Sequence, residues 1–80
     1  MITVTKVTPL ENYKLLLEFN NSDLKIFDMT QYLDYAQFKT LKNINTFNSV
    51  HIAYDTIQWD NGLDLCPEVL FSESICVINP

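Results

Sequence analysis

Three carboxylates recur every fourth residue near the end of the chain: Asp60, Asp64 and Glu68, in the stretch IQWDNGLDLCPEVLFSES. Carboxylate oxygens in such a series could bind a hard cation such as Ca²⁺. A calcium loop of the EF-hand type needs oxygen ligands at alternating positions and a Gly at the sixth. Here Gly62 is the third residue counted from Asp60, and leucines occupy the intervening positions. We therefore predict no metal site and interpret the stretch as a turn followed by a helix cap.

Each residue of the stretch has a structural role in this interpretation. Gly62 takes a positive φ in a turn after Asn61, and Trp59 packs into the core. Asp64 accepts backbone N–H groups at the start of the next turn, and Glu68 complements the dipole of a helix in its first turn. The alternative is a small-ligand-binding or enzymatic domain with a pocket near Trp59 and Asp64.

A nucleophile–base pair is the next chemistry to consider. His51 is the only histidine, and Cys66, Cys76 or a serine of FSES could be its nucleophile. His51 is out of phase with Val50 and Ile52 in a strand pattern, which predicts that it points to solvent with no group to orient it. We predict no catalytic residue here.

Asp28 and Asp34 could form an acid–base pair. An Asp at a strand end close to Thr30 is, however, typical of a turn or cap. The single Gly of the chain excludes a glycine-rich phosphate loop. We therefore predict no cofactor.

Composition limits the class of protein. The 80 residues are 48% hydrophobic, which indicates one globular domain spanning residues 1–80. Ten acidic residues against five lysines give a net charge of -5, which opposes direct binding to nucleic acid. There is no signal-peptide pattern and no apolar run long enough for a membrane span, so we expect a cytoplasmic protein without a membrane partner. Cys66 and Cys76 are expected to be unpaired, partly buried thiols.

The first third of the chain has the period of β-strands. We expect a strand at residues 2–8 that is closed by Pro9, which cannot donate to a sheet ladder. Alternation in YKLLLEF predicts a second strand with one face on the core, and LKIFD forms a third after the turn NNSD. Lys14 and Lys25 are then expected to be cross-strand neighbours, which is too few lysines for a basic patch.

The remainder changes period. Spacings of three and four in TQYLDYAQFKTLKN predict one or two short helices with Thr30 as N-cap, broken at Asn43 and Asn45. VHIAYDTIQW predicts a hairpin that turns near Asp55 and Thr56, and Pro67 begins a short helix packed on the sheet. The predicted fold class is α+β: a mainly antiparallel sheet of about five short strands with one or two short helices against it.

With these elements in place, the chain resembles a small bacterial family called domain of unknown function 2442. The resemblance covers nearly the whole chain. Its pattern is a Trp followed by a Gly, an Asp-Leu and a Pro-Glu-x-Leu, matched by Trp59, Gly62, Asp64, Leu65, Pro67, Glu68 and Leu70. The chain departs from it in two turns, with Asn21-Ser22-Asp23 in place of Asp-Gly and Ala36-Gln37 in place of a Gly.

The resemblance implies no established activity. Members stand alone or are joined to helix-turn-helix segments, and often neighbour another small protein in arrangements that look like toxin–antitoxin pairs. We therefore expect a non-enzymatic interaction or accessory module whose acidic shell attracts a small basic neighbouring-gene product. An exposed edge strand could also pair with a second copy, giving a homo-oligomer.

Overall fold

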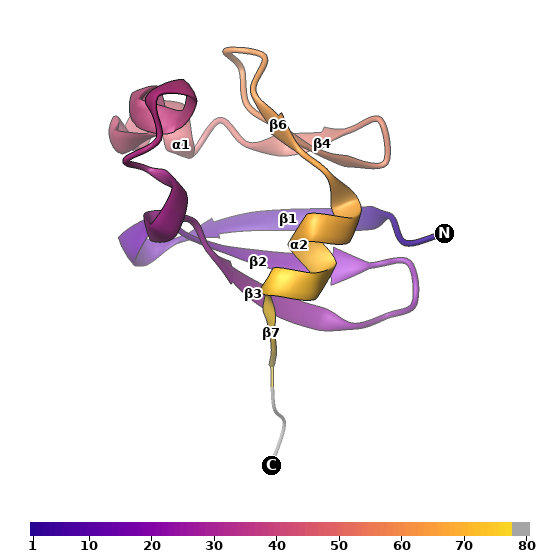
Figure 1. The fold of residues 1–80 in the computed structure, drawn as a ribbon. Helices are drawn as coiled ribbons and strands as arrows, with labels where there is room; N and C mark the ends of the chain where they lie inside the picture. The colour runs from indigo at the N-terminus through magenta and orange to yellow at the C-terminus, as the bar shows by residue number, and fades with distance from the viewer. Residues whose placement is uncertain (78–80) are drawn as a thin grey trace.

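The structure, a computed structural model, describes residues 1–77 (Figure 1). Its strands form two antiparallel sheets. Sheet A has the order β1-β2-β3-β7 and contains β1 (Val4–Leu10), β2 (Lys14–Phe19), β3 (Leu24–Asp28) and β7 (Ile75–Cys76). Sheet B has the order β4-β5-β6 and contains β4 (His51–Ala53), β5 (Thr56–Gln58) and β6 (Asp64–Leu65). The α+β class is confirmed, but two sheets replace the single sheet that was predicted.

β2 forms as its alternation predicts. Leu15, Leu17 and Phe19 are buried, while the residues between them are half-buried. A turn at residues 20–23 leads to β3, with Ser22 at a φ of 73°. The expected meander of β1, β2 and β3 is confirmed.

The limits predicted for the first strand were wrong at both ends. β1 begins at Val4 and continues through Pro9, which lies opposite Leu15. Because β1 is an edge strand of sheet A, a residue without an N–H group is tolerated there. The N–H of Val4 donates to the carbonyl of Asp55 at 2.9 Å, so β1 also joins sheet A to the hairpin of sheet B.

Short helical turns connect the two sheets. They are η2 (Met29–Tyr32), η3 (Ala36–Lys42) and α1 (Ile44–Phe47), and a further turn, η1 (Glu11–Tyr13), connects β1 to β2. Asp28, not Thr30 as predicted, caps η2, because its carboxylate accepts the Thr30 N–H at 2.9 Å. Asn43 does end η3, but its side chain also caps α1. The prediction that Asn45 breaks the helix was wrong, because Asn45 lies inside α1.

The hairpin of sheet B turns one residue earlier than predicted. Tyr54 and Asp55 have φ values of 53° and 65°, and Thr56 already belongs to β5. Two successive positive φ values are typical of the two-residue turn that suits the twist of a hairpin.

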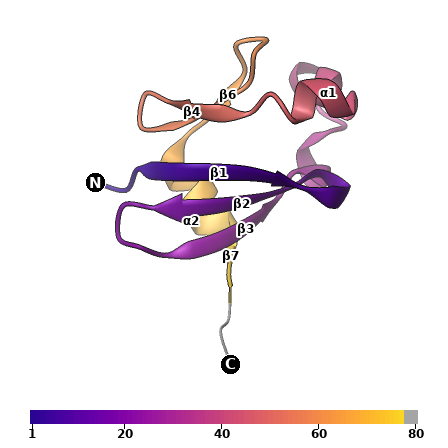
Figure 2. The ribbon, with the colours of Figure 1, turned by 180° about the vertical axis from the view of Figure 1, so that it is seen from behind.

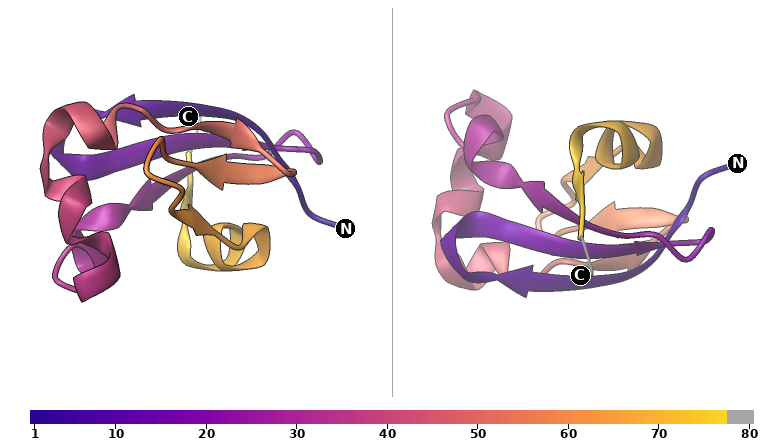
Figure 3. Two further views of the ribbon diagram at one scale, coloured as in Figure 1. Left: turned by 90° about the horizontal axis from the view of Figure 1, so that it is seen from above. Right: turned by 90° about the horizontal axis from the view of Figure 1, so that it is seen from below.

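The last helix, α2 (Pro67–Glu73), covers one face of sheet A, and Pro67 begins it as predicted (Figures 2 and 3). Leu70 is buried beneath α2, and the rings of Phe71 and Phe19 make an edge contact at 5.0 Å. Buried side chains of both sheets form one hydrophobic cluster. Within residues 1–77, no helix or strand covers the opposite face of sheet A, which is toward the viewer in Figure 2. No helix in the described chain has the length and apolar character that a membrane crossing requires.

Candidate functional site

The turn after β5 is fixed by a buried tryptophan. Trp59 is 1% exposed, and its indole N–H donates to the carbonyl of Phe47 at 3.0 Å. The N–H of Trp59 donates to the Leu63 carbonyl, while the Gly62 N–H donates back to Trp59. Gly62 has a φ of +90°, so the predicted turn with a positive φ at this Gly is confirmed.

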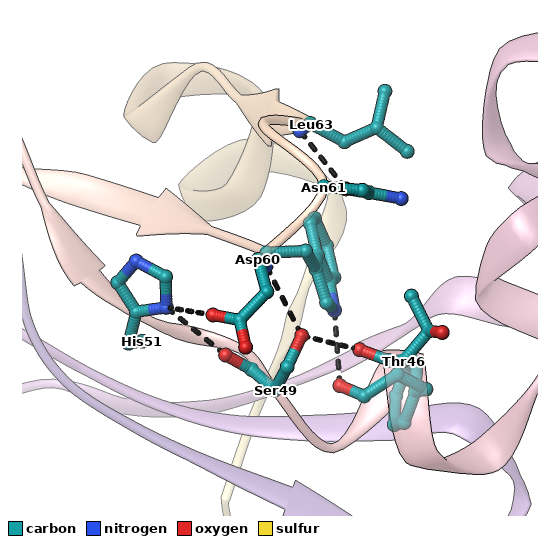
Figure 4. A network of polar contacts seen from close by, with 8 residues as sticks. Thr46, Ser49, His51, Asp60, Asn61 and Leu63 are labelled. Atoms are coloured by element: carbon teal, nitrogen blue, oxygen red, sulfur yellow. Dashed lines mark hydrogen bonds and ion pairs between the residues drawn. The ribbon is translucent and has the colours of Figure 1, made fainter.

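Beside this turn, His51, Asp60 and Ser49 form a polar network (Figure 4). The Nδ1 atom of His51 lies 3.6 Å from Asp60 Oδ1 and 3.0 Å from the Ser49 carbonyl oxygen. The expectation that nothing orients His51 was therefore wrong, although its exposure is confirmed.

The network does not form a nucleophile–base pair. The Ser49 hydroxyl donates to the Thr46 carbonyl at 2.6 Å and accepts the Asp60 N–H at 3.1 Å. A hydroxyl has one hydrogen to donate, and here the hydrogen goes to the backbone and not to the imidazole. These contacts among Thr46, Ser49 and Asp60 stabilise the loop, and we call them the loop brace. His51 and Asp60 are exposed at its edge.

A shallow hollow of about 370 Å³ adjoins the loop brace. Its lining is made of amide, hydroxyl and carboxylate side chains: Asn45, Thr46, Ser49, Asp60 and Asn61. Neither Trp59, which is buried, nor Asp64, which lies in β6, lines it. This hollow is therefore not the pocket predicted near Trp59 and Asp64, and that pocket stays a prediction.

The three carboxylates of the opening stretch lie on separate elements. Asp60 follows β5, Asp64 is in β6, and Glu68 is in the first turn of α2, as predicted. Among residues 1–77, no three His, Cys, Asp or Glu side chains gather as metal ligands would.

Asp64 does not have the role predicted for it. Within the described chain, no hydrogen bond to its carboxylate is present, and the side chain of Asn61 accepts the Leu63 N–H instead. Glu68 accepts from the thiol of Cys66 at 3.3 Å. Cys66 and Cys76 are unpaired as expected, but both are exposed where partial burial was predicted.

The suggested pair of Asp28 and Asp34 is not formed. Asp28 accepts from the hydroxyl and the N–H of Thr30, and these hydrogen bonds hold the pKa of the Asp28 carboxyl below its usual range. Asp34 forms an exposed ion pair with Lys42 at 3.2 Å.

Tyr32 makes a further polar contact, which connects the helical turns to α2. Its hydroxyl donates to the carboxylate of Glu73, and this bond raises the pKa of Tyr32 to about 12.

Lys25 is a residue whose position the sequence reasoning missed. It lies opposite Leu17, whereas Lys14 lies opposite Asp28, so the two lysines are not cross-strand neighbours as predicted. Lys25 is 8% exposed, and its Nζ donates to the Phe71 carbonyl at 2.6 Å and lies 3.9 Å from that ring's centroid. Its phase in LKIFD, the same as that of Phe27, is the signal that could have placed it on the inner face.

Comparison with known proteins gives a family but no individual relative. Neither the curated proteins nor the solved structures contain a significant match to the chain. Residues 4–75 match the family described as "Protein of unknown function (DUF2442)". The seven positions of the resemblance are distributed over one continuous segment. Trp59 directly follows β5, Gly62 lies in the turn, Asp64 and Leu65 form β6, and Pro67, Glu68 and Leu70 lie in α2. Trp59 and Leu70 are buried. Because the match covers nearly every described residue, the chain belongs to this family.

Proposed function

We propose that the chain is a cytoplasmic, non-enzymatic interaction module that binds a small basic protein, as the accessory or antidote member of a two-gene pair. One observation carries the proposal: the whole net charge belongs to the second half of the chain. Residues 1–42 contain five lysines and five acidic residues, whereas residues 43–80 contain five acidic residues and no lysine. All five of the latter are exposed: Asp55, Asp60, Asp64, Glu68 and Glu73.

Such a distribution favours association with a basic partner. Unbalanced charge on one part of a protein produces a field that attracts the opposite charge and raises the association rate. Within the described residues, the same half exposes four large apolar side chains, and two of them, Ile52 at 39% and Tyr54 at 89%, lie in or beside the hairpin turn between β4 and β5. They supply contact area that charge alone does not. The Ser49 hydroxyl donates its hydrogen to the Thr46 carbonyl and not to His51, which favours a binding role over a catalytic one.

The test is affinity capture from the native host with three forms of the tagged chain. The first is the parent, and the second carries Asp60→Asn, Asp64→Asn and Glu68→Gln. The matched control removes three charges from the first half by Glu11→Gln, Asp23→Asn and Asp34→Asn. We expect the parent and the control to retain a small basic protein that the second form loses, and rising salt to release it.

The purified partner is then titrated into each form by calorimetry. Equal loss of affinity in the second form and the control would contradict the proposal, because charge location would then be irrelevant. Capture of no basic protein in stoichiometric amount would also contradict it.

A second candidate function is binding of a small polar molecule in the hollow beside Asp60. The observation favouring it is a lining of amide and hydroxyl groups in a space of about 370 Å³. A thermal-shift screen of polar metabolites on the parent and on Asp60→Asn tests it. Stabilisation of the parent alone supports this candidate, and no stabilisation by any compound counts against it.

A further inference from the structure

The uncovered face of sheet A has a defined pattern. Strand registers place ten side chains on it, in three rows across the strands, which we call the outer face. One row contains Lys6, Glu18 and Leu24; the middle row contains Thr8, Leu16, Ile26 and Ile75; the third contains Leu10, Lys14 and Asp28. α2 lies on the other side of the sheet, so no helix or strand of residues 1–77 covers the outer face (Figures 2 and 3).

The middle row is apolar across three adjacent strands. Leu16 and Ile26 are half-buried, and Ile75 at the end of the row is 74% exposed. Leu24, beside this row, is 39% exposed and lines a small depression of about 90 Å³. Contiguous apolar surface on the face of a sheet commonly marks an interaction site.

The charges on the outer face differ from those of the proposed partner-binding half. Two lysines and two acidic residues give it no net charge: Lys6, Lys14, Glu18 and Asp28. A basic partner gains nothing from a neutral face, whereas a face with both signs can complement itself. We propose that the outer face of sheet A binds a second copy of this chain, forming a face-to-face dimer.

The positions of the charges select the symmetry axis. A two-fold axis parallel to the strands and centred on β2 would place Lys14 over Lys14 and Glu18 over Glu18 of the second copy. An axis along the middle row places Leu16 and Ile26 over themselves and Glu18 over Lys14 of the second copy. Like charges repel and unlike charges attract, so the second arrangement is the favoured one. It keeps the strands of the two sheets roughly aligned, as in sheet packings about 10 Å apart.

The area of the face sets the expected affinity. Four strands about 4.8 Å apart and rows about 6.8 Å apart cover on the order of 400 Å² per copy. Standard interfaces bury about 800 Å² per partner, so the dimer should be weak and concentration-dependent. We expect dissociation constants in the micromolar to millimolar range.

Substitutions of Leu24 test which symmetry axis the dimer has. Whether a negative or a positive charge at this position weakens the dimer distinguishes the two axes. The favoured axis places Leu24 over Asp28 of the second copy, whereas the axis along β2 places it over Lys6. We expect Leu24→Glu to weaken the dimer roughly tenfold, and Leu24→Lys to dimerise at least as tightly as the parent. Sedimentation equilibrium of the full chain from micromolar to millimolar concentration measures this.

Ile52 provides the matched control because it is also 39% exposed but lies in β4, outside the outer face. Ile52→Glu and Ile52→Lys change the net charge by the same amounts as the corresponding Leu24 variants. They should leave dimerisation unchanged. The proposal is overturned if the chain stays monomeric. It is also overturned if neither Leu24 variant changes the dissociation constant of the dimer. Reversed signs for the two Leu24 variants overturn the proposed axis.

Exchange of one ion pair gives an independent measurement if a Leu24 variant fails to fold. Glu18→Lys should dissociate the dimer, and adding Lys14→Glu should restore it, because opposite charges then face each other again. Circular dichroism verifies folding in each case. Failure of the double variant to recover dimerisation while folded also overturns the proposal. Binding of the basic partner uses different residues, so it can succeed or fail separately.

Discussion

The two halves of the chain, residues 1–42 and residues 43–77, contribute strands of different kinds to the two sheets. β1, β2 and β3 in the first half contain five to seven residues each, whereas β4, β5 and β6 contain two or three. The first half relies on long ladders with alternating burial. In the second half, individual side chains bond to distant backbone, as Trp59 does to Phe47 and Thr56 to Leu65.

The two halves share one core, yet they differ in the length of their strands and in their net charge. One hydrophobic cluster includes both halves, but the net charge belongs entirely to the half with short strands. Short strands bury little backbone, so their position depends on a few anchors. The half that we propose for partner binding is thus also the half most sensitive to single substitutions.

Loss of the main anchor should have the largest effect. Trp59→Ala removes a buried indole and its hydrogen bond to the Phe47 carbonyl, which keeps only the longer bond from the Val50 N–H at 3.4 Å. This change should cost about 3–5 kcal/mol of unfolding free energy, mainly through the lost packing of the indole. Urea denaturation followed by far-ultraviolet circular dichroism measures the loss. Trp59→Phe is the control that retains an aromatic ring and should lose less. A cost below about 1 kcal/mol for the alanine variant would show that the second half does not depend on this anchor.

The next effect concerns a lysine that joins the halves. Lys25→Met keeps the aliphatic length but removes the bond to Phe71 and the cation above its ring, and should cost about 1–3 kcal/mol. Lys39→Met, at an exposed position in η3, should change stability by less than about 0.5 kcal/mol. Equal effects in urea denaturation would mean that Lys25 does not hold α2 on sheet A.

Local pattern was enough to predict some of these elements and not others. Alternation placed β2, the turn NNSD placed β3, and Pro67 placed the start of α2, because each depends on residues close in sequence. β6 and β7 have two residues each and no period, since they exist only through pairing with β5 and β3. The network at His51 joins residues from separate segments, so spacing could not reveal it. The division of charge, by contrast, can be counted in the sequence.

A smaller effect should come from the turn that holds Trp59. A Cβ at Gly62 would have nothing within 4 Å, so Gly62→Ala adds backbone strain without a clash. The φ of +90° predicts a cost of about 1–2 kcal/mol. Asp55→Gly is the opposite change at a non-Gly residue with positive φ, and should not destabilise. Scanning calorimetry compares the two midpoints, and a higher midpoint for Gly62→Ala would contradict the strain argument.

The smallest effect should be a pH-dependent contact between the halves. Tyr32 of η2 donates to Glu73 of α2, and its pKa is raised from 10.0 to about 12. Because the folded-state pKa is raised, the stability that this contact contributes is complete below pH 10 and is lost as pH rises through about 12. Solvent near the contact screens it, which keeps the gain small. The difference in unfolding free energy between the parent and Tyr32→Phe should therefore shrink across this interval. Phenolate absorbance of the same two proteins should assign the group that titrates last to Tyr32. If the difference in unfolding free energy between the parent and Tyr32→Phe does not change with pH, the bond to Glu73 does not contribute to holding the two halves together.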